Sequence, residues 1–228
     1  MYSYMRQIEE NIINVPENHL ILASEFHKKY FNNIPETAYY KSLERLTSLG
    51  ILQHLTKGVY CRPKTSRFGI VPIPESQITS YFTRDNRGLV IGYRLFNKYG
   101  ISTQVGKKSE VLTNAITEEQ KKIGNVLLRK IDFKLSPERN KAIEALEILQ
   151  EFSSVEDSNE PALLSYMKEF ARSYSDKEMN FVLKNRKYKK STIAFMKYLL
   201  TSLSTKNSLD NYLSEMTKYK IPTLETLP

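Results

Sequence analysis

The sequence contains a single cysteine, Cys61, and no tryptophan. One cysteine cannot form an internal disulfide, so the sequence is typical of a protein that folds in a reducing compartment. No stretch approaches the roughly 18 apolar residues that a membrane-spanning helix requires. The first residues also lack a basic stretch followed by an apolar one, which is the pattern of a signal peptide. These absences predict a cytoplasmic protein with no membrane partner.

Glycine is scarce as well, with 8 residues in a chain of 228. No phosphate-binding loop of the GxGxxG or GxxxxGK[ST] type occurs, and no GxSxG motif indicates a nucleophile. The three histidines, His19, His27 and His54, stand apart from one another and from any Cys/His cluster, so no metal site is predicted. We therefore predict no cofactor and no catalytic residues, and we expect a protein that is not an enzyme.

Positive charge is what the sequence has in excess. Lys and Arg number 34 against 25 Asp and Glu, a formal net charge of +9. Basic proteins gain affinity for nucleic acid because binding releases counterions from the phosphates. The excess is even along the chain, with 9 basic and 6 acidic residues over 1–70, 13 and 10 over 71–152, and 12 and 9 over 153–228. Charge thus favours a nucleic-acid partner without indicating which region binds it.

The first 70 residues have the predicted element order of a winged helix-turn-helix. Apolar spacing predicts the helices, Gly50 is expected to end the last of them, and Lys57-Gly58 joins two β-favouring runs into a hairpin. The predicted elements are, in order, helices over 4–14, 24–30 and 36–50 and a hairpin over 51–63.

The predicted helix over 36–50 has two different faces. At 100° per residue, one face can pack on the other helices, and it holds Tyr39, Leu43, Leu46 and Leu49. The opposite face and its margin are expected to read base edges in the major groove, and they hold Thr37, Tyr40, Lys41, Glu44 and Arg45. The residues expected to contact phosphates are Lys57, Arg62, Lys64 and Arg67. Any solvated helix has a polar face, so the order of the elements is what favours DNA binding.

The pattern changes after two prolines at 72 and 74. Residues 71–152 predict helical segments over 75–83 and 88–100, strands over 109–116 and 123–132 joined by a charged turn, and a helix over 137–152. Residues 160–220 predict about four further helices. We therefore predict an α+β protein with a winged helix-turn-helix domain over 1–70, a small mixed α/β domain over 71–152 and a helical C-terminal region over 153–228.

A basic run, KNRKYKK, lies between two of the predicted C-terminal helices. Its five basic residues are Lys184, Arg186, Lys187, Lys189 and Lys190. The run is interpreted as a second phosphate-contact patch or as a docking surface for an acidic partner, and a solvated helix end is the alternative.

Residues 42–69 resemble the winged-helix signature of the AbiEi-like antitoxins, which belong to the AbiE abortive-infection systems, type IV toxin–antitoxin systems. In that signature a recognition helix ending in Leu-x-x-Leu and a glycine precedes a hairpin reading Gly-Val/Leu-Tyr and then a proline. The matching residues are Leu43, Leu46, Gly50, Gly58, Val59, Tyr60 and Pro63. Residues 88–105, GLVIGYRLFNKYGISTQV, are similar to a segment of an uncharacterised AbiEi-like subgroup.

The resemblance implies a transcriptional autorepressor that counters a cognate nucleotidyltransferase-like toxin in phage defence. It implies that the N-terminal domain binds double-stranded DNA at inverted repeats in its own promoter and that the C-terminal part serves neutralisation. Two alternatives remain, a solitary winged-helix transcription regulator and a protein-interaction module that docks through its helical tail. An enzyme such as a nuclease is a third, but no carboxylate pair stands out to carry its chemistry.

Overall fold

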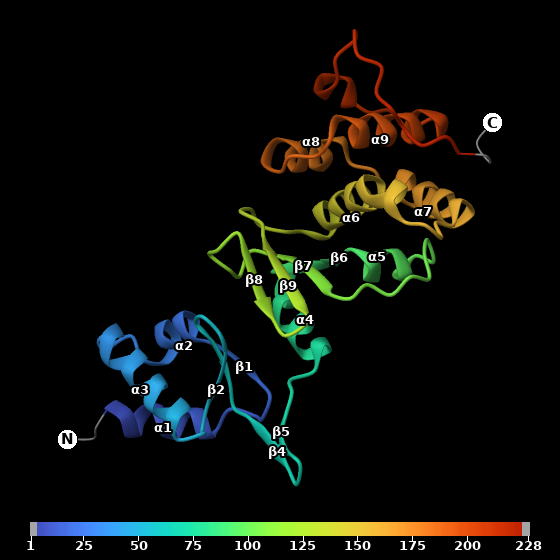
Figure 1. Cartoon of the computed structure of the whole chain (residues 1–228). Helices are drawn as coiled ribbons and strands as arrows, with labels where there is room; N and C mark the ends of the chain where they lie inside the picture. The colour runs from blue at the N-terminus through green and yellow to red at the C-terminus, as the bar shows by residue number, and fades with distance from the viewer. Residues whose placement is uncertain (1–3, 225–228) are drawn as a thin grey trace. The chain divides into compact units, whose positions relative to one another are not determined.

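The computed structural model describes residues 4–224. The chain divides into two compact units (Figure 1). The first takes in the chain up to Tyr81 together with Lys121–Val126, and the second takes in Phe82–Gln120 and the chain from Leu127 onward. The three-domain division expected from the sequence stays a prediction.

The first unit begins with three helices and a small sheet. Its elements are α1 (Tyr4–Ile13), β1 (Leu20–Leu22), α2 (Ala23–Tyr30), α3 (Glu36–Ser48), β2 (Gln53–Thr56), β3 (Val59–Cys61), β4 (Lys64–Ser66) and β5 (Gly69–Val71). Strand β3 pairs antiparallel with β1 on one side and β2 on the other. The predicted helices and the β2–β3 hairpin are confirmed. Strand β1 and the β4–β5 hairpin were not predicted, because three-residue strands are too short to show an alternating pattern.

Helix α3 is held by its apolar face. Tyr39, Leu43 and Leu46 are fully buried in one hydrophobic core with residues of α1, including Ile8 and Ile12. The predicted face is therefore confirmed at these three residues. Leu49 was also assigned to it, and that prediction is wrong, since its side chain is 65% exposed. The helix ends at Ser48, and a residue beyond the last turn no longer follows the helical spacing.

The second unit contains a mixed segment of strands and short helices. After α4 (Glu75–Thr83), which runs across the boundary between the units, come β6 (Gly88–Ile91), α5 (Tyr93–Lys98), β7 (Ser109–Thr113), β8 (Gln120–Ile123) and β9 (Val126–Lys130). Of these, β8 from Lys121 on and the first residue of β9 belong to the first unit. The strand order is β6-β7-β9-β8. The α+β class is confirmed, but two local predictions are wrong.

Both errors concern strands. Residues 88–100 were expected to be helical throughout, but 88–91 form β6, in which Leu89 and Ile91 are buried and pair with β7. Residues 117–122 were expected to form a charged turn, but 120–122 belong to β8 together with Ile123. The Gly124-Asn125 pair between β8 and β9 is typical of a tight hairpin turn, and Gly124 has the positive φ, 55°, that such a turn uses. This pair could have indicated that β8 and β9 form a hairpin.

The rest of the second unit is helical, as predicted. Its helices are α6 (Pro137–Glu151), α7 (Glu160–Arg172), α8 (Asp176–Asn185) and α9 (Lys190–Ser202). The last of the four helices expected over 160–220 was to begin near Leu209, but only a single 3₁₀ turn forms there, Leu209–Tyr212. Leu209 is buried and Leu213 is partly buried against the core, whereas Met216 is 97% exposed, so only the first part of the expected apolar stripe packs. Over the described range, no helix has the length and apolar character needed to cross a membrane.

One carboxylate joins the start of α8 to the segment after α9. Asp176 Oδ1 accepts hydrogen bonds from Tyr174 Oη at 2.8 Å and from the Ser208 backbone N–H at 2.9 Å. Its Oδ2 accepts from Ser208 Oγ at 2.7 Å and Asn180 Nδ2 at 3.1 Å. Burial alone would raise the pKa of Asp176, but these hydrogen bonds outweigh it and lower the pKa below its ordinary value.

We expect Asp176→Asn to lower the free energy of unfolding by about 2 kcal/mol at neutral pH, because it removes hydrogen bonds to a charged group. A carboxylate whose pKa is lowered by folding stabilises the protein above its unfolded pKa of about 3.9. The difference between the variant and the parent should therefore shrink as the pH falls below that value. Urea unfolding at several pH values measures it.

Glu215→Gln is the matched control, because Glu215 is exposed, and its effect should stay within about 0.5 kcal/mol. If Asp176→Asn unfolds at the same urea concentration as the parent at pH 7, the carboxylate does not hold these segments together.

Candidate nucleic-acid interface

The turn between α2 and α3 is fixed by a short network. His27 Nε2 lies 2.8 Å from the Ile34 carbonyl oxygen, a distance at which the ring N–H donates a hydrogen bond across the turn. The His27 ring also packs on Tyr39, with 4.7 Å between centroids, and Phe31 lies 5.7 Å from the same tyrosine ring. Phe31 and Ile34 are buried. This packing sets how α3 lies against α2, and it therefore determines where the outer face of α3 points.

The outer face of α3 holds the residues predicted to read base edges. Thr37, Lys41, Glu44 and Arg45 are exposed and Tyr40 is half-buried. Burial, followed by the charge of Glu36, raises the pKa of Tyr40, so its hydroxyl stays protonated and can donate a hydrogen bond. Within residues 4–224 neither Lys41 nor Arg45 forms an ion pair. The face thus presents two cations that form no ion pair, together with hydroxyl groups and one carboxylate.

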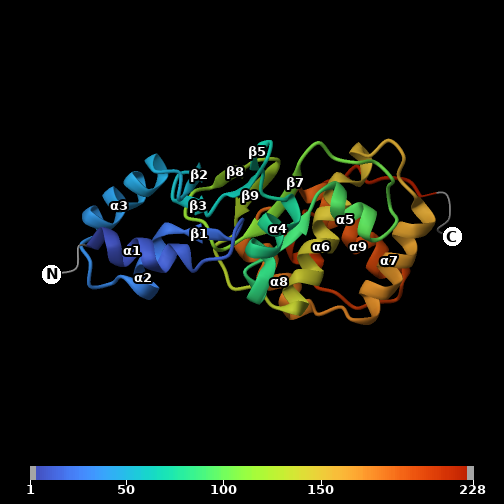
Figure 2. The same ribbon diagram turned by 90° about the horizontal axis from the view of Figure 1, so that it is seen from below.

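Two hairpins follow α3 in the first unit. The first is β2–β3, and its tip holds the exposed Lys57 beside Gly58, whose φ of 71° suits a tight turn. The second is β4–β5, which holds Lys64 in its first strand and Arg67 in its turn, both exposed. Figure 2 shows α3, β2 and β3 toward one edge of the first unit, with α1 and α2 toward the other.

Arg62 differs from the other predicted phosphate contacts. Its Nη1 donates to the carbonyl oxygens of Ile13 at 2.6 Å and Val15 at 2.9 Å, at the C-terminal end of α1. A guanidinium there satisfies carbonyls that the helix leaves without partners and complements the helix dipole. Arg62 therefore has a structural role, which residue type and position alone did not indicate.

The neighbouring Cys61 is buried in β3, and burial raises the pKa of its thiol to about 11. A thiol with such a pKa stays protonated at neutral pH and is a poor nucleophile.

The sequence from the end of α3 through the two hairpins contains a long stretch without acidic residues. From Arg45 to Pro74 the sequence contains no Asp or Glu, while five basic residues occur: Arg45, Lys57, Arg62, Lys64 and Arg67. The net charge over 1–70 does not reveal this stretch, because all six acidic residues of that range lie before it, the last at Glu44. Positive charge is therefore concentrated on the end of α3 and the two hairpins.

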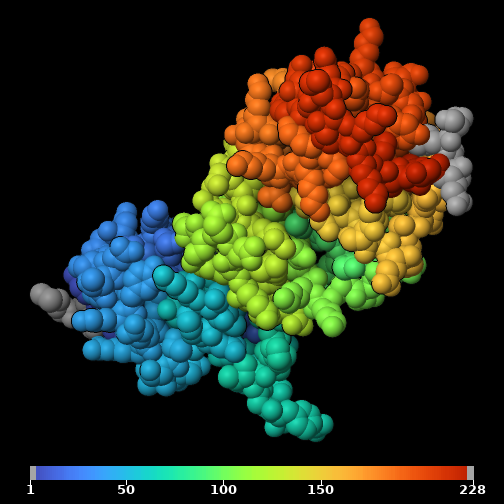
Figure 3. Space-filling model, turned by 45° about the horizontal axis from the view of Figure 1, so that its top comes forward, coloured from blue at the N-terminus to red at the C-terminus, as the bar shows by residue number. Residues whose placement is uncertain are grey.

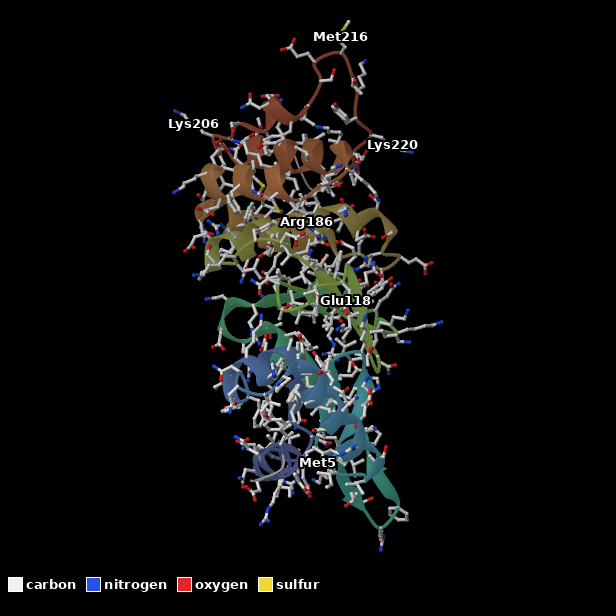
Figure 4. All side chains as sticks on the ribbon, turned by 90° about the vertical axis from the view of Figure 1, so that its left-hand side faces the viewer. Met5, Glu118, Arg186, Lys206, Met216 and Lys220 are labelled. Atoms are coloured by element: carbon white, nitrogen blue, oxygen red, sulfur yellow. The ribbon has the colours of Figure 1, made fainter. Side chains whose placement is uncertain are left out.

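The basic run over 184–190 does not form one uniform patch. Lys184, Lys187, Lys189 and Lys190 are exposed, but Arg186 turns inward. Its Nη2 lies 2.9 Å from Glu147 Oε1 on α6, and the same oxygen accepts from Tyr188 Oη at 2.9 Å. Figure 4 labels Arg186 among the helices, whereas Lys206 and Lys220 reach outward. The lysines stay a predicted patch, and Arg186 serves as an internal partner.

A cavity of about 250 Å³ lies beside this pair in the second unit. Its polar lining includes Glu147 with Arg186 and a second ion pair, Glu110 with Arg129, whose Oε2–Nε distance is 2.8 Å. Within the described part of the chain, no group of three His, Cys, Asp or Glu side chains is arranged to hold a metal ion.

The motif over 88–105 builds a loop. Asn97 Nδ2 donates to the carbonyl oxygens of Ser102 and Gln104 at 2.7 and 3.1 Å. Asp157 accepts from Ser102 Oγ and Thr103 Oγ1, each at 2.6 Å, and these hydrogen bonds lower its pKa. Sequence reasoning missed Asp157 because it lies more than 50 residues from the loop that it anchors.

The chain belongs to DUF6088, a family of unknown function, whose model matches residues 7–154. No curated protein matches the sequence. Among solved structures, the chain is similar to the RV2827C protein from Mycobacterium tuberculosis, with a TM-score of 0.44 and 12% identity over 89% of this chain and 78% of that one. At this level of likeness, function has to be argued from the residues of this chain.

We expect Arg186→Ala to lower the free energy of unfolding by about 3 kcal/mol, because it leaves the buried Glu147 carboxylate without its cation. Lys187→Ala is the matched control, because Lys187 is adjacent to Arg186 but exposed. Its replacement should lower the free energy of unfolding by less than about 0.5 kcal/mol. Urea unfolding followed by circular dichroism measures both. Equal midpoints for the two variants would show that Arg186 is not needed inside the second unit.

Proposed function

We propose that this member of the DUF6088 family is a DNA-binding regulator whose first 70 residues act as a winged helix-turn-helix. The order of elements supports it: α1, β1, α2, a tight turn, α3, and then the β2–β3 hairpin, with the three strands in one sheet. In this assignment α3 is the recognition helix, and β2–β3 is the wing.

The observation that carries the proposal is that the two cations on the outer face of α3 are exposed and form no ion pair within the described residues. Lys41 and Arg45 lie one turn apart, exposed, and the acid-free stretch begins at Arg45. Keeping cations free of carboxylate partners has no benefit for folding, but it suits a surface that displaces counterions from phosphates. On the same face, Thr37, Tyr40 and Glu44 supply hydrogen-bond donors and acceptors, which recognition of base edges in a major groove requires.

The roles of the individual residues follow from their positions. We assign Thr37, Tyr40, Lys41, Glu44 and Arg45 to the major groove. We assign Lys57, Lys64 and Arg67 to flanking phosphates. Arg62 has the carbonyl oxygens at the end of α1 as partners, so we give it no DNA contact.

The biological role proposed is that of an antitoxin and autoregulator in the cytoplasm. Its support is the resemblance of residues 42–69 and 88–105 to AbiEi-like antitoxins. In this role the chain binds inverted repeats in its own promoter as paired copies, because a two-fold DNA site matches a two-fold pair of proteins. The second unit, with its exposed lysines near 184–190, then serves to counter a nucleotidyltransferase-like toxin.

A triple variant, Lys41→Ala/Arg45→Ala/Lys57→Ala, tests the DNA-binding surface. We expect the full-length variant to bind the DNA upstream of its own gene at least about tenfold more weakly than the parent. The slope of log K against log salt should fall by about one unit for each cation that no longer meets a phosphate. Fluorescence anisotropy over a salt series measures both quantities.

Lys168→Ala is the matched control, because it removes an exposed cation from α7 in the second unit. It should leave the affinity and the slope unchanged. If the triple variant binds as tightly as the parent, the assignment of α3 as the recognition helix is wrong.

Co-expression tests the antitoxin role separately. A nucleotidyltransferase-like reading frame adjacent to the gene is expressed from an inducible promoter, and growth is followed with and without this chain. We expect the chain to restore growth, and the triple variant to do so as well when both are expressed from an unrelated promoter, because neutralisation is assigned to the second unit. If growth stays arrested when the parent chain is expressed, the antitoxin role is wrong and a solitary regulator is the remaining interpretation.

A further inference from the structure

The β4–β5 hairpin has a well-defined turn. Lys64 pairs with Val71, Thr65 with Ile70 and Ser66 with Gly69, so only Arg67 and Phe68 form the loop. Ser66 Oγ accepts from the Phe68 backbone N–H and donates to the Gly69 carbonyl oxygen, each at 3.2 Å. Gly69 has a φ of 105°, a conformation that favours glycine. The loop is therefore held in one shape by its own hydrogen bonds.

The same hairpin buries almost nothing. All three residues of β4 are exposed, and so are Gly69 and Ile70 of β5. The Phe68 side chain is 85% exposed and that of Ile70 is 55% exposed. A two-stranded ribbon without a core is only marginally stable by itself, so packing does not explain why this segment has these residues. Figure 3 shows the hairpin projecting from the first unit.

The tip of the hairpin combines a cation with an aromatic ring. The Arg67 guanidinium carbon lies 4.7 Å from the centroid of the Phe68 ring, a cation–π distance. Within residues 4–224 neither Arg67 nor Lys64 forms an ion pair. The tip also lies within the acid-free stretch from Arg45 to Pro74. A polyanion fits this surface better than a protein partner does, because no carboxylate near the tip in sequence would repel it.

We propose that the Arg67–Phe68 tip enters the minor groove of DNA beside the site that α3 occupies, and that Phe68 acts as a wedge between base pairs. This inference rests on the proposed DNA-binding function and adds a second point of contact to it. A narrow minor groove has an enhanced negative potential that attracts arginine. Apolar side chains inserted from that groove unstack a base step and kink the duplex by about 20–90°. A loop of only two residues is narrow enough to enter it.

Phe68→Ala is the critical variant, and its high exposure means that folding does not depend on it. The probe is the DNA upstream of the gene, labelled at both ends for energy transfer. We expect the parent to shorten the end-to-end distance on binding and the variant to bind without this bend, with about tenfold lower affinity because the ring no longer stacks on a base. A 2-aminopurine placed at the kinked step should brighten with the parent and stay quenched with Phe68→Ala.

Arg67→Ala should weaken binding and lower the salt slope by about one unit. Distamycin, which occupies the minor groove, should compete with the parent and much less with the Arg67→Ala/Phe68→Ala double variant. Ile70→Ala is the matched control, since it removes an exposed apolar side chain from the same hairpin away from the tip, and it should leave the bend unchanged.

The outcomes separate the two proposals. If the triple variant of α3 and the wing loses binding while Phe68→Ala binds and bends the DNA as the parent does, the minor-groove wedge is overturned and the DNA-binding function stands. Unchanged binding by the Arg67→Ala/Phe68→Ala double variant has the same meaning. If the parent binds no DNA at any salt concentration, both proposals fall.

Discussion

Tyr39, Leu43 and Leu46 have no exposure to solvent, and their burial against α1 and α2 determines how α3 lies. A helix has one geometry, so burying this face turns Lys41 and Arg45 outward. The hydrogen bond from His27 to the Ile34 carbonyl oxygen closes the turn before α3 and restricts the helix further. The proposed reading face therefore needs no interactions of its own to stay in place. Its side chains are free to contact a partner because the opposite face holds the helix.

Charge is used differently in the two units. In the second unit three arginines lie next to carboxylates: Arg186 with Glu147, Arg129 with Glu110, and Arg139 with Glu178 at 2.7 Å. Each of these pairs joins two elements, and removing one member of a buried pair leaves the other charge without compensation. In the first unit Arg45 follows Glu44 directly but forms no ion pair in the described residues, and the cations from Lys57 to Arg67 have no carboxylate near them in sequence. An equal net charge in each third of the chain thus conceals two arrangements, cations paired with carboxylates inside the second unit and exposed cations without ion pairs in the first.

Local patterns predicted the helices and the inner face of α3 because helical periodicity repeats within a few residues. They missed β1 and the β4–β5 hairpin, whose strands are three residues long. They gave no sign of the internal partners of Arg62 and Arg186, because these partners lie 49 and 39 positions away. A basic residue that binds carbonyl oxygens or a buried carboxylate is identical in sequence to one that meets phosphate. Only the fold separates the two, so local patterns predicted the exposed face of α3 but not the surroundings of the basic residues that follow it.

The helical tail shares a core with the sheet that precedes it. One hydrophobic cluster joins Leu89 and Leu112 of the strands to Leu146 of α6 and to Leu199 and Leu200 of α9. The match to the family ends at residue 154, inside this cluster, so the matched segment alone would leave its apolar surface uncovered. Deleting the tail would therefore unfold the sheet as well as remove any partner surface, and a loss of function would not distinguish the two causes. The role of the tail has to be sought in exposed side chains such as Lys184 and Lys187, whose replacement leaves the shared core intact.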